Sequence, residues 1–502
     1  MQADFSRDTF DPAKHFSAVL SQQGRVQLDA DLNEQAAILL HQLRTAVADV
    51  VGPAGAPAAA PGFEITQIPG KVVDLGISPG RIYVDGILVE NGDPTTYWTQ
   101  PDGHLDPDNA DDKLPDGPHL VYLRVWERLV TAMQDPAIRE VALGDPGPDT
   151  AARAKVVWQV AALPVQARTV QDARTEFGNW LQTTRPTGML MADAKRPTEA
   201  TDDPCHLPPD ARFRGPENQL YRIEVHTGGP AWPSTGPQAP TRRRGRASAA
   251  SVAGATFKWS RENASVVFAI ESIAGAVVRL AGLGRDGKLG LEVGDRVEIV
   301  DDTVTARAAG DVVLADPPVA APRLWRVQTI DPADRTVTLD GEVDGPVGGN
   351  PLLRRWDHAS TPIGAPPANL AEDGAIPIRE NEWIDLEDGV RVRFEAPAEV
   401  KGTYRRGDYW LIPARTAIGD VLWPESGTGP LARAPHGVRY HHAPLAFVSD
   451  GTVDRTPRHV FVPLAAPPES QSKELATTPS KSPAPRQPRS RSRRAAQAET
   501  EE

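Results

Sequence analysis

Residues 36–90 have the sequence AAILLHQLRTAVADVVGPAGAPAAAPGFEITQIPGKVVDLGISPGRIYVDGILVE, and the repeat of apolar side chains changes within them. Over residues 36–51 the apolar residues recur at helical spacing, and they form one stripe: Ile38, Leu39, Leu43, Val47 and Val50. From residue 63 onward the pattern alternates, and Pro79-Gly80 and Asp85-Gly86 separate short β-branched runs as hairpin turns do. One amphipathic helix followed by antiparallel β-structure is therefore predicted.

The residues before this helix predict how it begins. Residues 4–43, DFSRDTFDPAKHFSAVLSQQGRVQLDADLNEQAAILLHQL, start as a flexible, extended arm with one tight turn at Gly24. The helix is then expected to start after a cluster of acidic and amide side chains, the residue types that favour helix N-termini. That cluster consists of Asp29, Asp31 and Asn33.

The residues after the helix predict a break in the structure. Gly52 and Pro53 are a typical helix end, because glycine accepts a left-handed conformation and proline cannot continue the helix. Residues 54–62, AGAPAAAPG, are small and rich in proline, which predicts a linker. We therefore interpret residues 1–53 as an attachment segment, with the apolar stripe from Ile38 to Val50 as its docking surface.

Composition favours a mainly β protein of several parts. The chain has 502 residues, of which 49 are prolines and 42 are glycines, and this content shortens regular elements and multiplies turns. The formal net charge of −13 argues against nucleic acid as a partner of the folded body. A single cysteine, Cys205, excludes an intrachain disulfide. We therefore expect small antiparallel β units without covalent cross-links.

The location of the protein is predicted from its apolar runs. The N-terminus, MQADFSRDTF, is charged where a signal peptide needs an apolar core, and no run of about 18 apolar residues occurs. We expect synthesis and folding in the cytoplasm, no membrane insertion, and release from the cell only as part of a larger particle.

The pattern after the linker divides the rest of the chain. We expect a β-rich domain at 63–276, a small barrel-like insert at 277–345 and a C-terminal β-rich part at 346–466. The barrel is predicted from the strands in LEVGDRVEIVDD and from two further strands on either side of the Asp331-Pro332 turn. Residues 467–502 are dominated by Ser, Pro and Arg, so a disordered tail is predicted there.

The chemistry-bearing residues form no known catalytic motif, and no cofactor or metal is expected. His441 and His442 are adjacent and would point to opposite faces of a strand. Eight tryptophans fall one per predicted strand, which favours core anchors over a carbohydrate platform. Four acidic residues around Trp383 have the composition of a sugar site, but an exposed turn beside one buried tryptophan is the preferred interpretation: Glu382, Asp385, Glu387 and Asp388.

Several segments resemble a known group of proteins. They are QQGRVQLDADLNEQ, YLRVWERLVTAMQDPAIREVALG, ENQLYRIEVH, TFKWSRENASVVF and GDYWLIPARTAIGDVLWP. The chain up to its tail resembles uncharacterised proteins encoded near phage-tail-like contractile injection systems in bacteria. The first segment is also similar to N-terminal attachment regions of phage tail and baseplate-associated proteins. The resemblance implies a setting and no catalytic residue, and we expect Lys258, Arg261 and Arg415 to form structural ion pairs.

Three functional hypotheses follow. The leading one is a non-enzymatic structural or adaptor component of a phage-tail-like particle, docked onto a protein partner through the N-terminal arm and helix. The alternative is a cargo or surface protein whose β units bind a glycan, which requires aromatic side chains exposed on one face. The third is a hydrolase that uses a carboxylate pair such as Glu382 and Asp385.

Overall fold

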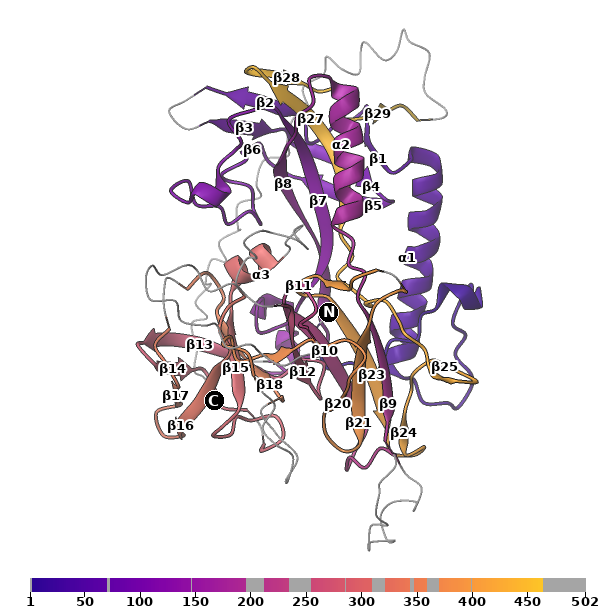
Figure 1. The fold of residues 1–502 in the computed structure, drawn as a ribbon, viewed down its shortest axis with the longest axis vertical. Helices are drawn as coiled ribbons and strands as arrows, with labels where there is room; N and C mark the ends of the chain where they lie inside the picture. The colour runs from indigo at the N-terminus through magenta and orange to yellow at the C-terminus, as the bar shows by residue number, and fades with distance from the viewer. Residues whose placement is uncertain are drawn as a thin grey trace, which may run out of the picture.

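The computed structural model describes residues 2–69, 73–145, 147–195, 212–233, 254–284, 286–308, 321–343, 347–358, 370–398 and 400–463. Within these ranges the protein is mainly β, as predicted (Figure 1). The described residues form three β bodies, and few helices accompany them. The predicted tail at 467–502 and Cys205 lie outside the described residues.

The helices are short apart from the first two α-helices. They are η1 (Pro12–Lys14), α1 (Asp29–Val51), η2 (Ala110–Asp112), η3 (Pro136–Ile138), η4 (Val141–Leu143), α2 (Val170–Thr183) and α3 (Asp302–Ala308). As predicted, α1 ends before Gly52, whose N–H bonds to the carbonyl of Ala48 at 2.8 Å. Among the described residues, no helix combines the length and the apolar character that spanning a membrane requires.

The first body, here called the terminal sandwich, uses both ends of the chain. Its strands are β1 (Ala54–Pro57), β2 (Ile65–Ile68), β3 (Asp74–Ile77), β4 (Gly80–Val84), β5 (Ile87–Asn91), β6 (Thr95–Thr96), β7 (His119–Val130), β8 (Arg153–Pro164), β27 (His441–Ser449), β28 (Thr452–Asp454) and β29 (Val460–Phe461). The sheet β29-β1-β4-β5 and the three-stranded sheet β2-β3-β6 share one core with the sheet β28-β27-β7-β8. On its outer face, β7 and β27 are covered by α2 (Figure 1).

The second body, the central sandwich, uses the middle of the chain. Its strands are β9 (Met189–Ala194), β10 (Gln219–Thr227), β11 (Gly229–Pro230), β12 (Thr256–Ser260), β19 (Ile376–Pro377), β20 (Trp383–Asp385), β21 (Val390–Glu395), β22 (Thr403–Tyr404), β23 (Tyr409–Arg415), β24 (Asp420–Val421), β25 (Glu425–Ser426) and β26 (Gly429–Pro430). The sheets β19-β12-β10-β23-β24 and β20-β21-β9 enclose an apolar core. It includes Tyr221, Ile223, Phe257, Trp259, Val392, Phe394, Trp410 and Ile412.

The third body is the predicted barrel. It closes in the order β13-β14-β17-β16-β15-β18, from β13 (Val267–Ala274), β14 (Val277–Leu280), β15 (Arg296–Val300), β16 (Trp325–Asp331), β17 (Thr336–Leu339) and β18 (Leu352–Trp356). The two strands predicted on either side of the Asp331-Pro332 turn are β16 and β17. Large apolar side chains fill the interior, including Phe268, Val278, Leu280, Val297, Trp325, Val337 and Leu353. The barrel is therefore a packed core and not a pore.

The bodies are nested along the chain, which differs from the serial arrangement of the predicted ranges 63–276, 277–345 and 346–466. The barrel spans 267–356, so both predicted boundaries cut off one of its strands. It interrupts the central sandwich, and the central sandwich interrupts the terminal one. Alternation predicts strands and does not identify their partners, since partners here lie hundreds of residues apart.

The expected linker at 54–62 is corrected by the structure. Residues 54–57 form β1, which pairs antiparallel with β4 and parallel with β29. The small residues serve close packing: a Cβ on Gly55 would lie 2.8 Å from the side chain of Val51, and one on Gly62 would lie 2.3 Å from the backbone of Gly80. The glycines in this segment therefore allow close packing of the backbone and do not indicate a flexible linker.

Candidate docking surface

The helix α1 is fixed against the terminal sandwich and lies at the edge of the molecule (Figure 1). One side contacts the turn between β4 and β5, where the N–H of Asp85 bonds to the carbonyl of Pro53 at 2.8 Å. Arg44 forms a two-point ion pair with Glu127 of β7 at 2.7 and 2.9 Å. Ile38 on this side is 1% exposed. The helix is thus held in place by the body of its own chain.

The helix begins at Asp29, within the predicted acidic cluster and not after it. Leu28 occupies the N-cap position and makes no side-chain capping bond. The Asp29 carboxylate instead accepts hydrogen bonds from the N–H and the hydroxyl of Ser6, at 2.9 and 2.6 Å. Burial acts to raise the pKa of Asp29, but the bonds from Ser6 outweigh it and lower that pKa. Asp29 therefore binds the arm to the helix.

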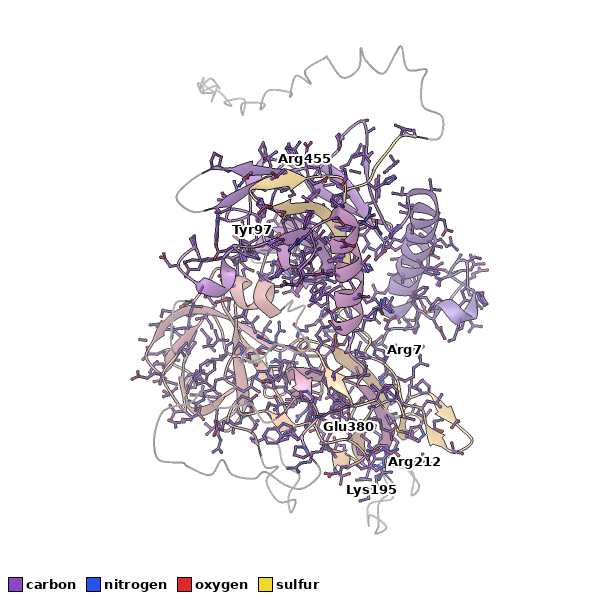
Figure 2. All side chains as sticks on the ribbon, turned by 45° about the horizontal axis from the view of Figure 1, so that its top comes forward. Arg7, Tyr97, Lys195, Arg212, Glu380 and Arg455 are labelled. Carbon is purple, nitrogen blue, oxygen red and sulfur yellow. The ribbon has the colours of Figure 1, made fainter. Side chains whose placement is uncertain are left out.

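The N-terminal arm is anchored in the central sandwich, which corrects the expectation of a flexible arm. Gln2 donates to the Glu224 carboxylate at 2.9 Å, and Asn263 donates to the carbonyl of Ala3 at 2.8 Å. In the part of the chain that the structure describes, no ion pair of Arg415 is found; its guanidinium donates to the carbonyl of Ser6 at 2.6 Å, so the ion pair predicted for Arg415 stays a prediction. Figure 2 shows Arg7 where the arm passes from the central sandwich towards α1.

Buried charges lie beneath this anchor. Lys258, 3% exposed, is bound to Glu298 of the barrel at 2.6 Å and lies 3.4 Å from Glu224, as an ion pair of the predicted kind. Burial acts to raise the pKa of Glu224, but Arg222 and Lys258 lower it to about 2. Glu298 also accepts from the Trp356 indole at 2.9 Å. The network joins the arm, the central sandwich and the barrel.

The outer side of α1 carries most of the predicted stripe. Leu39, Leu43 and Val50 are 54%, 60% and 65% exposed, and Val47 is half-buried. Ile38 does not belong to this surface, because its side chain is buried. Leu32 and Leu40 lie on the outer side and are absent from the predicted stripe. A helix start placed at Asp29 would have brought Leu32 into it.

The arm adds further exposed apolar side chains next to α1. The N–H of Val19 bonds to the Gln35 amide at 2.6 Å, which holds the arm along the helix. Phe16, Leu20, Val26 and Leu28 are exposed on this segment. Arm and outer side together form the surface that we call the α1 surface. Large exposed apolar side chains gathered in this way are typical of an interaction site.

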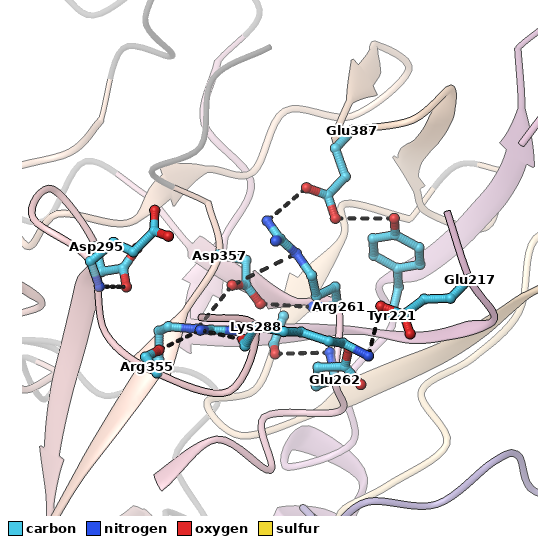
Figure 3. A network of polar contacts seen from close by, with 12 residues as sticks. Glu217, Tyr221, Arg261, Glu262, Lys288, Asp295, Arg355, Asp357 and Glu387 are labelled. Carbon is cyan, nitrogen blue, oxygen red and sulfur yellow. Dashed lines mark hydrogen bonds and ion pairs between the residues drawn. The ribbon is translucent and has the colours of Figure 1, made fainter. Parts of the chain in front are cut away.

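The carboxylates near Trp383 have different surroundings. Glu382 and Asp385 are exposed, whereas Glu387 accepts from the Tyr221 hydroxyl at 3.1 Å and from Arg261 at 2.8 Å (Figure 3). Burial raises the pKa of Glu387 to about 7, against the lowering effect of Arg261. Of the four carboxylates, Glu387 thus has structural partners.

The same cluster ties the barrel to the central sandwich. Arg261 also lies 3.8 Å from Asp357, which pairs with Arg355 of β18 at 3.2 Å (Figure 3). Lys288 pairs with Glu217 and Glu262, both at 2.9 Å. The prediction of a structural ion pair for Arg261 is confirmed. The charged residues of this cluster thus have a structural role, because their ion pairs hold the barrel against the central sandwich.

The histidines and tryptophans have structural surroundings. As predicted, His441 and His442 point to opposite faces of β27: the first bonds to Asp85 at 2.8 Å, and the second packs against Tyr122 and Trp180. None of the eleven tryptophans is exposed, and seven are buried. The core role predicted for the strand tryptophans is confirmed apart from Trp383, which is half-buried. In the described ranges, no group of three potential metal ligands occurs.

The described surface also has open depressions, among them the following two. One, of about 610 Å³, lies where β28 meets the start of β2 and includes Glu64, Arg455 and Arg458. Arg455 pairs with Glu64 at 2.8 Å, and Figure 2 shows it at the far end of the terminal sandwich. The other, of about 370 Å³, lies at one end of the barrel. Neither brings together convergent groups for a reaction.

Comparison with known proteins gives a family for the chain. The model of a family of unknown function, DUF6519, matches residues 1–182 and 181–500. No curated protein and no solved structure shows a significant match. The boundary between the two matched segments falls at the end of α2, where the chain passes from the terminal to the central sandwich. The chain therefore belongs to the family of unknown function DUF6519.

Proposed function

We propose that the protein is a non-enzymatic structural or adaptor component of a phage-tail-like contractile injection particle, which docks through its N-terminal arm and helix. The observation that carries the proposal is the α1 surface. Leu39, Leu43 and Val50 project from a helix whose other side is fixed by Arg44 and Ile38. The helix therefore presents apolar side chains without needing to fold on contact with a partner.

The particle setting rests on the resemblance of QQGRVQLDADLNEQ, residues 22–35, to attachment regions of phage tail and baseplate-associated proteins. These residues contain the Gly24 turn and the start of α1. Val26 and Leu28 within them are exposed. The segment that carries the resemblance thus forms part of the surface to which we assign docking.

Glycan binding and hydrolysis have less support. A glycan platform needs exposed aromatic rings, and all eleven tryptophans are buried or half-buried. A hydrolase needs two carboxyls across a cleft, and neither Glu382 nor Asp385 lines either of the two depressions described above. Release from the cell would follow from assembly into the particle.

The test uses substitutions on the surface of the intact chain. Deleting the arm would remove Gln2 and Ala3 from the central sandwich, so Leu39→Glu with Leu43→Glu is the sharper change. The matched control is Val141→Glu with Leu143→Glu, two apolar residues of η4 that are 81% and 58% exposed. In particles purified from cells, we expect the amount of the Leu39→Glu, Leu43→Glu variant to be lower than that of wild type by about tenfold or more. The amount of the control variant should equal that of wild type. Equal incorporation of both would reject the proposal.

A further inference from the structure

The exposed side of α1 has the spacing of a coiled-coil seam. Its central line follows intervals of four and three residues in strict alternation: Leu32, Ala36, Leu39, Leu43, Ala46 and Val50. All six are exposed. A 3.5-residue repeat keeps its apolar line facing a second helix along its whole length. The seam therefore fits another helix better than a sheet or a loop.

The seam is also symmetric about position 41. A second copy running in the opposite direction matches residues of similar size: Leu39 with Leu43, Ala36 with Ala46, and Leu32 with Val50. Layers of two alanines let the helices approach closely between layers of larger side chains. We propose that the free protein pairs with a second copy of itself through α1, as an antiparallel twofold dimer. A twofold interface of this kind uses one patch on both copies.

Charge favours this pairing over other contacts between copies. Each chain carries a formal net charge of −13, so contact between most surfaces is repulsive. Between residues 32 and 50 the seam itself carries no charge, and its flanks carry Gln35, Gln42 and Asp49. In the antiparallel pair Asp49 lies near Gln35 of the second copy, so the helix residue Asp49 does not face its own copy.

The antiparallel direction follows from Asp29. This residue lies seven positions before Ala36 and thus occupies the same place in the repeat. A parallel pair in register would bring Asp29 against its own copy, which is repulsive. An antiparallel pair separates these carboxylates to opposite ends and also aligns the helix dipoles favourably.

Pairing goes beyond the proposed function and uses the same surface. A free protein with exposed leucines is prone to association, and the dimer covers them until docking exposes one copy. Dimer and docked protein are then alternative states. The fixed position of α1, through the Arg44–Glu127 ion pair, lowers the ordering entropy that pairing costs.

The first experiment is light scattering on the full chain at micromolar concentration. We expect a mass of twice 54.0 kDa for wild type and for Val141→Glu with Leu143→Glu, and the monomer mass for Leu39→Glu with Leu43→Glu. A monomeric wild type, or a dimer that persists after the Leu39 and Leu43 changes, would overturn the inference. If wild type is monomeric and still enters particles, the pairing inference alone is overturned. If wild type is dimeric and the Leu39→Glu, Leu43→Glu variant still enters particles, the docking proposal alone is overturned.

The second experiment fixes the direction by disulfide cross-linking in a Cys205→Ser background. Ala36→Cys with Ala46→Cys should give a covalent dimer under oxidation, because these positions face each other across the antiparallel pair. The two cysteines within one helix are about 15 Å apart and cannot bond to each other. Ala36→Cys alone should stay uncross-linked. Cross-linking by the single variant would indicate a parallel pair and contradict the proposed arrangement.

Discussion

At the residue scale, buried charges hold three separate parts of the molecule together. Lys258 lies between Glu224 and Glu298, and its ammonium is 4.3 Å from the centre of the Trp356 ring. Glu224 in turn accepts from Gln2 of the arm. Burying an ion pair this deeply removes both charges from water, which is unfavourable on its own. Removing only one partner therefore leaves the other charge buried without compensation and destabilises the protein. The arrangement fixes where the barrel and the arm sit on the central sandwich.

Replacing Lys258 by Met is expected to lower the free energy of unfolding by about 3–5 kcal/mol, because Glu298 would stay buried without its cation. Urea unfolding measures this loss. The double variant Lys258→Met with Glu298→Gln should recover part of it. Arg279→Met, which breaks an ion pair to Glu271 with both side chains more than 40% exposed, should cost no more than about 1 kcal/mol. If Lys258→Met also lowered the free energy of unfolding by no more than about 1 kcal/mol, the buried ion pair would not have the stabilising role assigned to it.

Residue roles could be predicted from the sequence only where neighbours along the chain determine them. The exposed positions of Leu39, Leu43 and Val50 follow from helical spacing within α1. The burial of Ile38 depends on which side of α1 faces the rest of the molecule, and contacts with residues far along the chain, such as the ion pair from Arg44 to Glu127, fix that side. The same limit applies to Arg415, whose partner is the backbone of Ser6.

At the element scale, α1 and the turn between β4 and β5 meet through their backbones. Gly86 has a φ of +78°, and a Cβ added there would lie 2.1 Å from the carbonyl oxygen of Arg44. Gly24 has a similar φ of +69°, with nothing within 4 Å of its Cβ position. The two glycines share a conformational requirement and differ in the space around them.

Gly86→Ala is therefore expected to displace α1, whereas Gly24→Ala should cost only the left-handed strain of about 1–2 kcal/mol. Hydrogen exchange of the α1 amides separates the two effects. We expect faster exchange in the half of α1 around Arg44 for Gly86→Ala and unchanged exchange there for Gly24→Ala. Equal rates in both variants would mean that the close approach does not hold the helix.

Element types could be predicted better than their partners. The alternation in LVYLRVWERLV and KVVWQVAALPV predicts β7 and β8, which pair along their whole length. The same kind of pattern gives no sign that β27 pairs with β7 on its other side, through Phe447 and Leu120. The incorrect prediction of a linker at 54–62 has a related cause. The small residues there pack against partners that are remote in the sequence, so their role could not be predicted from their neighbours.

At the scale of the whole molecule, the nesting of the three bodies makes the C-terminal strands part of the N-terminal body. In the sheet β28-β27-β7-β8, β27 separates β28 from β7. Its residues Ala443, Leu445 and Ala446 lie in the same core as β4 and β5. The central sandwich and the barrel use only strands between residues 189 and 430. Stability of the first part of the chain thus depends on its last described strands.

Ending the chain at residue 439 should therefore unfold the terminal sandwich and leave the other two bodies folded. Limited proteolysis read by mass spectrometry would show rapid cleavage within 54–164 and protection within 189–430. The reason is that removal of β27 leaves one edge of β7 unpaired, takes Ala443, Leu445 and Ala446 out of the shared core, and removes β29 from β1. A chain ending at residue 463 keeps all described strands and serves as the control, with cleavage equal to the full chain. Protection of 54–164 in the shorter chain would show that the N-terminal strands fold without β27. The stability of the terminal sandwich would then not depend on the C-terminal strands.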